Sequence, residues 1–449
     1  MALARKTMAA IAVGAATMGL AAACSSGKSS TPPAQSGSPA AAAFKGQSFT
    51  ILGQWTGLEQ SAFQSVINAF DKSTGAKGQY TPAAGGSEPT VLGAKVAGGT
   101  PPDIAILSLP GAIAQYGTAG KLHALSATSK AAVAQNFATE WANLATVKGT
   151  EYGVPVDASD KSTVWYNATA FKNAGITSTP TTWQGLIADA KTLAASGVHT
   201  PISVGGGDGW TLTDWFENVY IRTAGIANYD KLTHHQIKWT DPTVATALTT
   251  LKQIWGDKAL IGSPSAALTV PFTGSVDNVF KASPTSAIVY EASFVATTIP
   301  ADKDPAKVGT VAKYFAFPSI NGSAPVVEAA GDFAVAFTSN PAAQAFMTFL
   351  ASPQAAQLLV SYPGSGFISA NKNLAATAYP DATTAGLGQQ IVSVGDNFRF
   401  DMSDQAPAAF GGTPNKGEWA DLQNFLSNGN VQAAQAALEK HAESVTWTS

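Results

Sequence analysis

Residues 331–357 read GDFAVAFTSNPAAQAFMTFLASPQAAQ, and this stretch decides the fold class. Phe333–Phe337 is a short apolar run bounded by turn residues, which is typical of a buried strand. Asn340-Pro341 predicts the start of a helix, because an Asn side chain caps the first turn and proline fits its first position. Ser352-Pro353 repeats this signal. The stretch therefore predicts a strand followed by two helices.

The same alternation extends toward both ends of the chain. Further predicted strands are Phe49–Leu52, Ile104–Leu107 and Ser286–Tyr290. After the first of these strands, apolar residues recur at helical spacing until a stop at Gly75. Thr181 and Gln184 have the spacing of a capping box, which predicts another helix start. Strands that alternate with amphipathic helices indicate an α/β architecture.

Length and composition limit the class of protein. The chain has 449 residues, too many for one ordinary hydrophobic core, so two folded domains are predicted. Hydrophobic residues make up 45% and charged residues 12%, as in a globular body. The net charge is −3 and no basic stripe is present, which argues against nucleic acid as a partner.

The N-terminal residues have the pattern of an export signal followed by a tether. Arg5 and Lys6 precede an uncharged, Ala-rich stretch that is shorter than a membrane-spanning helix requires. The small residues before Cys24, the only cysteine in the chain, resemble a bacterial lipobox, although Ala21 stands where leucine is usual. We predict a signal peptide at residues 1–23, lipidation of Cys24, and a flexible tether at residues 24–43. The alternative is an ordinary signal peptide cut elsewhere, with loss of Cys24.

The inventory of reactive residues does not favour an enzyme. None of the five histidines has metal-ligand spacing, and the adjacent His234 and His235 are predicted to be a solvated loop pair. The sequence contains neither a Gly-x-Ser-x-Gly elbow nor a phosphate loop. Gly205–Gly209 lacks dinucleotide-binding spacing and is predicted to be a flexible loop. Scattered carboxylates leave a glycosidase pair open, but we expect no catalytic residue, metal or cofactor.

Four segments, in this order, carry a resemblance to a known family. They are TPPDIAIL (100–107) with Gly120–Leu122, YGVPVDASDKSTVWYN (152–167), PTTWQGLIADAKTLAASG (180–197) and the stretch 331–357. Together they resemble the extracellular solute-binding proteins of ABC importers, in the sugar-binding group that includes maltose-binding protein. The resemblance implies an α/β, two-lobe periplasmic-binding-protein-like fold with a hinge and an inter-lobe cleft. It places the first lobe at residues 44–154 plus 321–365 and the second at 155–320 plus 366–449.

The resemblance and the residue types together suggest a sugar site. The C–H faces of a sugar ring pack on aromatic rings, and its hydroxyls bind carboxylates, amides and lysines. Side chains of these types follow the first predicted strand or stand at positions where family members bind ligand. The predicted ligand-binding residues are Gln54, Trp55, Glu59, Asp160, Lys161, Trp210, Asp214, Glu291, Phe294, Asp332, Arg399, Asp401 and Trp419.

Several of these residues have a competing structural interpretation. Glu59 could simply favour a helix N-terminus, Asp332 could be a turn residue, and Arg399 could belong to a structural ion pair. Four other tryptophans are embedded in apolar or helical patterns and are expected in the core. They are Trp165, Trp183, Trp215 and Trp255.

The resemblance implies an exported lipoprotein on the outer face of the cell membrane. It would capture a mono- or oligosaccharide between its lobes, close over it and deliver it to the permease subunits of an ABC importer. We expect a monomer that touches the membrane through its lipid anchor only. The alternatives are the same fold binding another solute, such as a polyol, glycerophosphodiester or peptide, and an exported glycoside hydrolase.

Overall fold

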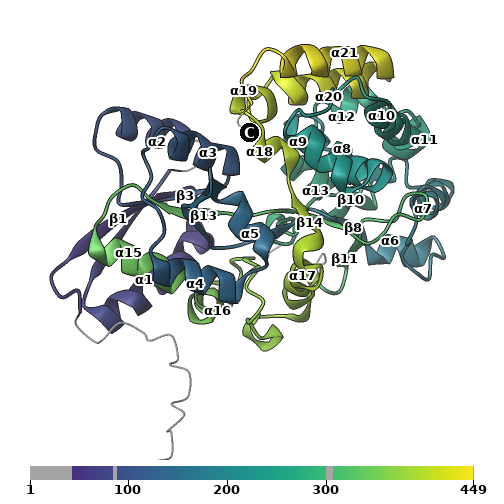
Figure 1. Cartoon of the computed structure of the whole chain (residues 1–449). Helices are drawn as coiled ribbons and strands as arrows, with labels where there is room; N and C mark the ends of the chain where they lie inside the picture. The colour runs from purple at the N-terminus through teal and green to yellow at the C-terminus, as the bar shows by residue number, and fades with distance from the viewer. Residues whose placement is uncertain (1–42, 84–87, 300–306, 448–449) are drawn as a thin grey trace, which may run out of the picture. The chain divides into compact units, whose positions relative to one another are not determined.

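The computed structural model describes residues 43–83, 88–299 and 307–447. The predicted signal peptide, Cys24 and nearly all of the predicted tether lie outside the described residues. In the described parts, strands and amphipathic helices alternate as the sequence predicted, and the helices gather around two separate mixed sheets (Figure 1). None of the helices in these parts is long and apolar enough to cross a bilayer.

The first lobe is built on a five-stranded sheet. Its strands, in spatial order, are β2 (Lys77–Pro82), β1 (Ser48–Gly53), β3 (Ile104–Leu107), β13 (Phe333–Ala336) and β6 (Gly153–Pro155). Its helices are α1 (Gly57–Thr74), α2 (Glu88–Ala97), α3 (Pro110–Thr118), α4 (Ala127–Asn136), α5 (Thr139–Leu144), α15 (Pro341–Leu350) and α16 (Pro353–Val360). β1 runs parallel to β2 and β3, whereas β13 is antiparallel to β3 and β6. In Figure 1, α2 and α3 lie on one side of this sheet and α1 and α15 on the other. A small hairpin of β4 (Thr146–Val147) and β5 (Thr150–Glu151) completes the lobe.

The second lobe is built on a four-stranded sheet. Its strands, in spatial order, are β11 (Ala312–Ala316), β8 (Thr163–Asn167), β10 (Ile288–Tyr290) and β9 (Ile202–Ser203). The helices before β11 are α6 (Ala168–Asn173), α7 (Trp183–Ala195), α8 (Trp210–Ala224), α9 (Ile226–Thr233), α10 (Pro242–Trp255), α11 (Lys258–Ile261), α12 (Pro264–Ala267), α13 (Phe272–Phe280) and α14 (Val295–Thr298). The later ones are α18 (Met402–Gln405), α19 (Ala408–Gly411), α20 (Gly417–Asn428) and α21 (Val431–Ala442). Before them come η1 (Ala376–Ala378), α17 (Ala382–Ser393) and η2 (Gly395–Asn397); α17 contacts β7 (Ser159–Asp160) and β12 (Val327–Ala330), and its buried hydrophobic residues belong to the hydrophobic core around β1 and α1. Among these, α8 contacts α9, α10 and α20.

A third sheet lies where the chain passes between the two larger sheets. Its strands are β14 (Phe398–Phe400), β12 (Val327–Ala330) and β7 (Ser159–Asp160). Only Gly331 and Asp332 separate β12 from β13 of the first lobe. A Cβ on Gly331 would lie 2.5 Å from the carbonyl oxygen of Asp157, so this passage requires a glycine. The close approach places Asp332 beside the chain that leaves β6.

The predicted helix boundaries are confirmed where the residues that cap the helix are close to it in the sequence. The side chain of Asn340 accepts hydrogen bonds from the backbone N–H groups of Ala342 and Ala343, and Ser352 caps α16 in the same way. α1 ends at Gly75, whose φ of 78° is the left-handed conformation that favours glycine.

The predicted capping box at Thr181 is wrong by one residue. Thr182 is the N-cap, and its hydroxyl accepts a hydrogen bond from the backbone N–H of Gly185. The cause is tertiary: Ser319 donates to the carbonyl of Thr181 and accepts from the N–H of Trp183, which holds this segment extended. The amide of Gln184 instead donates to Gln253.

Two predicted loops are more ordered than expected. Gly205–Gly207 is a packed segment, because a Cβ on any of these three residues would meet other atoms at 3.1 Å or less. These glycines therefore permit close packing rather than flexibility. His234 is exposed as predicted, but His235 is half-buried with its Nε2 3.3 Å from the Glu439 carboxylate.

The core tryptophans are where the sequence predicted them. Trp165, Trp183, Trp215 and Trp255 are each at most 2% exposed. Three of them, Trp183, Trp215 and Trp255, belong to a hydrophobic core that is separate from the core around β1 and α1.

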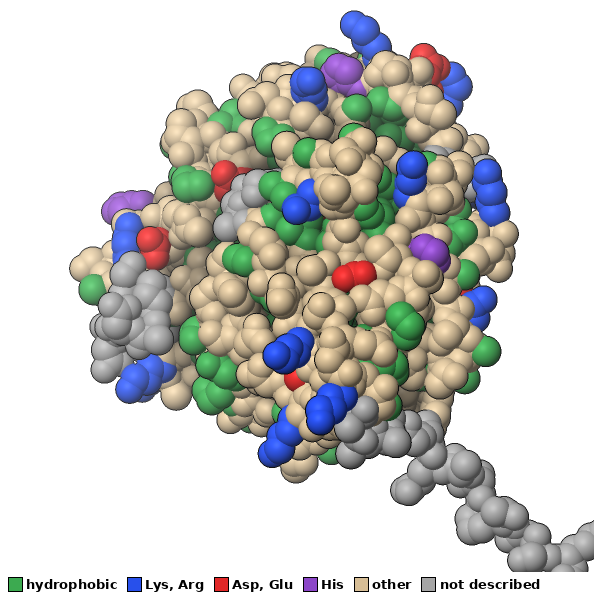
Figure 2. Space-filling view, turned by 90° about the vertical axis from the view of Figure 1, so that its left-hand side faces the viewer, with side chains coloured by type: hydrophobic (Ala, Val, Ile, Leu, Met, Phe, Trp, Pro, Cys, Tyr) green, Lys and Arg blue, Asp and Glu red, His purple; other side chains and the backbone are tan. Residues whose placement is uncertain are grey.

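On the face shown in Figure 2, lysine and arginine side chains are scattered and form no basic patch.

Candidate functional site

Polar side chains follow two neighbouring parallel strands of the first lobe. Gln54 comes directly after β1, and Glu88 opens α2 after β2. Because the carboxyl ends of parallel strands meet at one edge of a sheet, both residues belong to the edge where such sheets bind ligands. Asp332, which precedes β13, joins them there: the amide of Gln54 donates to its two carboxylate oxygens at 3.2 and 3.4 Å.

Asp332 is 5% exposed, and burial raises its pKa to about 6, against the lowering effect of hydrogen bonds from the side chains of Gln54 and Trp55. Its backbone N–H donates to the carboxylate of Asp157 at 2.7 Å. Burial, followed by the charge of Asp332, raises the pKa of Glu88 to about 7. Together with burial, the negative charge of Asp332 therefore raises the pKa of the neighbouring carboxyl groups of Glu88 and Asp157.

The other predicted residues of this lobe differ in exposure. Trp55 is only 2% exposed and packs edge-on against Phe63 and Phe367, with ring centroids 4.9 and 5.1 Å away. It supports the site from the core. Glu59 lies exposed in the first turn of α1.

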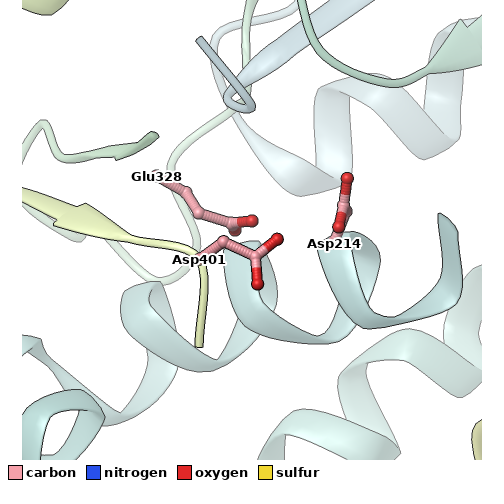
Figure 3. A group of neighbouring side chains, drawn as sticks. All are labelled: Asp214, Glu328 and Asp401. Atoms are coloured by element: carbon pink, nitrogen blue, oxygen red, sulfur yellow. The ribbon is translucent and has the colours of Figure 1, made fainter. Parts of the chain in front are cut away.

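A buried ionic network forms the corresponding part of the second lobe. The ammonium of Lys161 lies 3.1 Å from a carboxylate oxygen of Asp214 and also contacts Asp401, although all three side chains are more than nine-tenths buried. Figure 3 shows Asp214, Asp401 and Glu328 converging from α8, the end of β14 and β12. Burial lowers the pKa of Lys161, but Asp214 and Asp401 outweigh this effect and raise it well above its ordinary value.

The carboxyl groups of this network have unequal pKa values. Burial raises the pKa of Asp214 to about 6 even though Lys161 lowers it. The pKa of Asp401 is below its ordinary value, since Lys161 and hydrogen bonds from Ser403 and Asp404 outweigh burial. Glu291 lies beside Asp214; burial and then the charge of Asp214 raise its pKa. Lys161 is thus a fixed internal counter-ion for an interior that is rich in acids.

Asp214, Glu328 and Asp401 have carboxylate oxygens within 4.8 Å of one another, close enough to hold a metal ion. The Lys161 ammonium, bound to two of the three, already supplies the positive charge there. The residues therefore fit an internal ion pair better than a metal site.

Three aromatic rings lie next to this network. Trp210, the first residue of α8, has its ring centroid 5.2 Å from that of Phe272 and 6.0 Å from that of Phe294. All three rings are only half-buried, and the Lys161 ammonium is 5.9 Å from the Trp210 ring centroid. Trp419 packs against Gly209, where a Cβ would lie 2.9 Å from the Trp419 Cβ. The second lobe thus presents accessible aromatic surface beside buried charges, a combination that suits an amphipathic ligand.

Two predicted residues lie away from these groups. Asp160 is fully buried; its carboxylate accepts from the N–H of Ser162, and burial raises its pKa to about 7. It can support the site only from beneath the surface. Arg399 forms a bidentate ion pair with Asp230 at 2.5 and 3.1 Å. This agrees with the alternative interpretation of Arg399 as part of a structural ion pair rather than a ligand-binding residue.

A cavity of about 670 Å³ is lined by both lobes. The first lobe contributes α2 and α3, including Glu88, Leu92 and Tyr116, and the second contributes residues 405–409 and 444–446. None of the predicted ligand-binding residues is among the described residues that line it. The link between this cavity and the site is Glu88, which lines the cavity and whose pKa is raised by burial and by the charge of Asp332.

Sequence reasoning missed Glu88 and Phe272. An acid followed by proline is a helix-start signal at Glu88, but β2, the strand that brings Glu88 to the same edge as Gln54, was not predicted from the sequence. Phe272 carries no local signal, since its ring meets that of Trp210, 62 positions earlier in the chain, only in the folded protein.

Comparison with known proteins places these observations in a family. The family model described as bacterial extracellular solute-binding protein matches residues 55–357. The osmoprotective compounds-binding protein GgtB of Synechocystis sp. is 32% identical over 87% of this chain and 91% of its own length. The alpha-glucosides-binding periplasmic protein AglE of Rhizobium meliloti is 29% identical over 89% of this chain and 88% of its own.

The fold has well-matched neighbours among solved structures. The bacterial solute receptor AcbH, described as having an exclusive preference for β-D-galactopyranose, superposes with a TM-score of 0.72 at 18% identity. The match covers 88% of this chain and 99% of that receptor, so the two-lobe architecture is shared throughout. The chain therefore belongs to the family of bacterial extracellular solute-binding proteins of ABC transporters.

Proposed function

We propose that this protein captures a sugar in the cleft between its lobes and delivers it to the permease of an ABC importer. The half-exposed group of Trp210, Phe272 and Phe294 beside buried carboxylates is the observation that carries the proposal. Aromatic faces suit the C–H faces of a sugar ring, and carboxylate and amide groups suit its hydroxyls. The names of AglE and AcbH, which refer to alpha-glucosides and a galactopyranose, support the same ligand class.

Within this proposal the predicted residues have different roles. Gln54, Glu59, Trp210, Phe294 and Trp419 retain accessible surface and contact the ligand directly. The buried residues hold these groups in place; they are Trp55, Asp160, Lys161, Asp214, Glu291, Asp332 and Asp401. Arg399 is assigned to a structural ion pair with Asp230 instead.

Closure of the lobes is the proposed mechanism of capture. A ligand that contacts both lobes binds the closed form more tightly, and this difference in affinity shifts the population toward closure. The family resemblance puts the lobe boundaries near residues 154, 320 and 365, and we propose that the chain passages there absorb the closure motion. We further propose that Cys24 is lipidated and that the tether after it leaves the folded body free to reach the permease.

A panel of sugars in a thermal-shift assay, followed by calorimetry for each hit, tests the proposal. A ligand present at 100 times its Kd should stabilise the protein by ~2.7 kcal/mol. Recovery of the bound sugar unchanged after long incubation would separate a binding protein from a glycoside hydrolase.

The name of GgtB provides a second candidate class, osmoprotective compounds other than sugars. The panel should therefore include polyols and glycine betaine. Binding of these compounds alone, with no response to any sugar, would contradict the sugar proposal and favour this alternative.

A further inference from the structure

A group of carboxyl groups around Asp332 has no positive partner. It consists of Asp157, Glu59, Glu88 and Asp404 together with Asp332, and it draws on both lobes. Within the described ranges of the chain, none of the five has a lysine, arginine or histidine nitrogen within 4.0 Å. Lys161 lowers the pKa of Asp404 alone among them, and its ammonium is already bound to Asp214 and Asp401.

Glu88 is the member of this group that faces a ligand-sized space. Its side chain is 6% exposed, its Oε1 is buried without a hydrogen-bond partner among the described residues, and the residue lines the cavity of about 670 Å³. A buried carboxylate oxygen without a partner is costly, and such groups are normally satisfied by protein, water or ligand. The cavity is also lined by Gln405, the residue that follows Asp404 in α18.

The charges of the group oppose one another. Burial and the charge of Asp332 raise the pKa of Glu88 to about 7. For Asp404, burial and the charge of Asp401 raise the pKa well above its ordinary value, more than Lys161 lowers it. A neutral hydroxyl that binds here can donate a hydrogen bond to a carboxylate oxygen, but it does not balance the negative charge of the group. A protonated amine supplies three donors and also the missing positive charge.

We infer that the ligand of this cleft carries a basic amine, and that its ammonium group binds Glu88 under the joint field of Asp332 and Asp404. The preferred ligand class is thus an amino sugar with a free amine, rather than a neutral, N-acetylated or anionic sugar. This inference rests on the proposed function, since it specifies which sugars the same cleft selects.

Calorimetry with matched sugars tests the inference. Glucosamine, N-acetylglucosamine and glucose, and the corresponding β-1,4-linked disaccharides, should be titrated into the full chain at pH 6.5 and constant salt. We expect at least one free-amine sugar to bind about tenfold or more tightly than its N-acetylated and hydroxyl counterparts, and rising salt to reduce this preference.

Variants that remove one carboxylate charge then show which residue causes the preference for a free amine. Glu88→Gln should reduce the ratio of amine to N-acetyl affinity to within about threefold of unity. Asp404→Asn should reduce it partly, and it serves as the second variant if Glu88→Gln fails to fold. Glu443→Gln, which removes one exposed carboxylate that pairs with Lys238, is the matched control and should keep the full preference.

Neutral sugars binding as tightly as their amine counterparts would overturn the inference and leave the proposed function standing. A preference for the amine that survives both Glu88→Gln and Asp404→Asn would overturn it as well. Failure of every sugar in the panel to bind would instead contradict the proposed function itself.

Discussion

Replacement of Trp210 by alanine separates a binding role from a structural one. The Trp210 ring is half-buried and touches the rings of Phe272 and Phe294, which are themselves half-buried. Each aromatic pair contributes ~0.5–1.5 kcal/mol, so we expect Trp210→Ala to lower the free energy of unfolding by only ~1–3 kcal/mol. A stacking aromatic at a binding hot spot is worth ~1–3 kcal/mol of affinity, which corresponds to an increase in Kd of about 5- to 150-fold.

Trp183→Ala is the matched control with the opposite expectation. Trp183 is 2% exposed, stacks on Phe317 at 6.0 Å and donates its indole N–H to Gln253 at 2.9 Å. The cavity left by this substitution should cost ~3–5 kcal/mol of stability. The affinity of the folded variant should stay close to that of the wild type, because the ring lies in the core.

Urea denaturation gives the stability of each variant, and isothermal calorimetry with the tightest-binding sugar gives the affinity. If Trp210→Ala leaves Kd unchanged, or if it destabilises the protein as much as Trp183→Ala does, then the aromatic rings around Trp210 do not contact the bound sugar. Either result would refute the prediction.

Three further predictions concern the buried charges and the anchor. Lys161→Met should destabilise the protein by ~3–5 kcal/mol in urea denaturation, since it leaves Asp214 and Asp401 buried without their counter-ion; a neutral effect would show that the ion pair is dispensable. The pKa of Asp160 rises from 3.8 to about 7 on folding, so the folded state holds its proton more tightly and stability falls as pH rises between these values. Relative to Asp160→Asn, the wild type should therefore lose ~2–3 kcal/mol between pH 5 and pH 8, and an equal difference at both pH values would refute the shift. Metabolic labelling with a fatty-acid analogue should mark the wild type but not Cys24→Ser, which should be released as folded protein; an unlabelled wild type would contradict lipidation.

The parts of the fold that sequence reasoning predicted are those determined by neighbours in the chain. Asn340 caps α15 and Gly75 ends α1 through bonds to residues at most four positions away. The start of α7 was misplaced because Ser319, distant in sequence, holds the segment before Trp183. The packed state of Gly205–Gly207 was missed for the same reason, since the atoms that exclude a side chain there come from residues far along the chain.

The site was predicted in its residue types more than in its geometry. Lys161 and Asp401 are 240 positions apart in the sequence, and no sequence pattern indicates which charged side chains pair in the folded protein. Exposure also depends on the fold: Trp55 and Trp210 both follow a turn, yet only Trp210 keeps accessible surface. Glu88 was overlooked because its significance comes from the cavity that α2 shares with residues of the other lobe.

A crystal structure of the protein with its tightest-binding sugar tests the central claim most directly. We predict a sugar ring packed against Trp210, with polar contacts from Gln54 or Glu88 of the first lobe in the same complex. A ligand bound by one lobe alone, or at a place remote from both the aromatic group and Asp332, would contradict capture between the lobes.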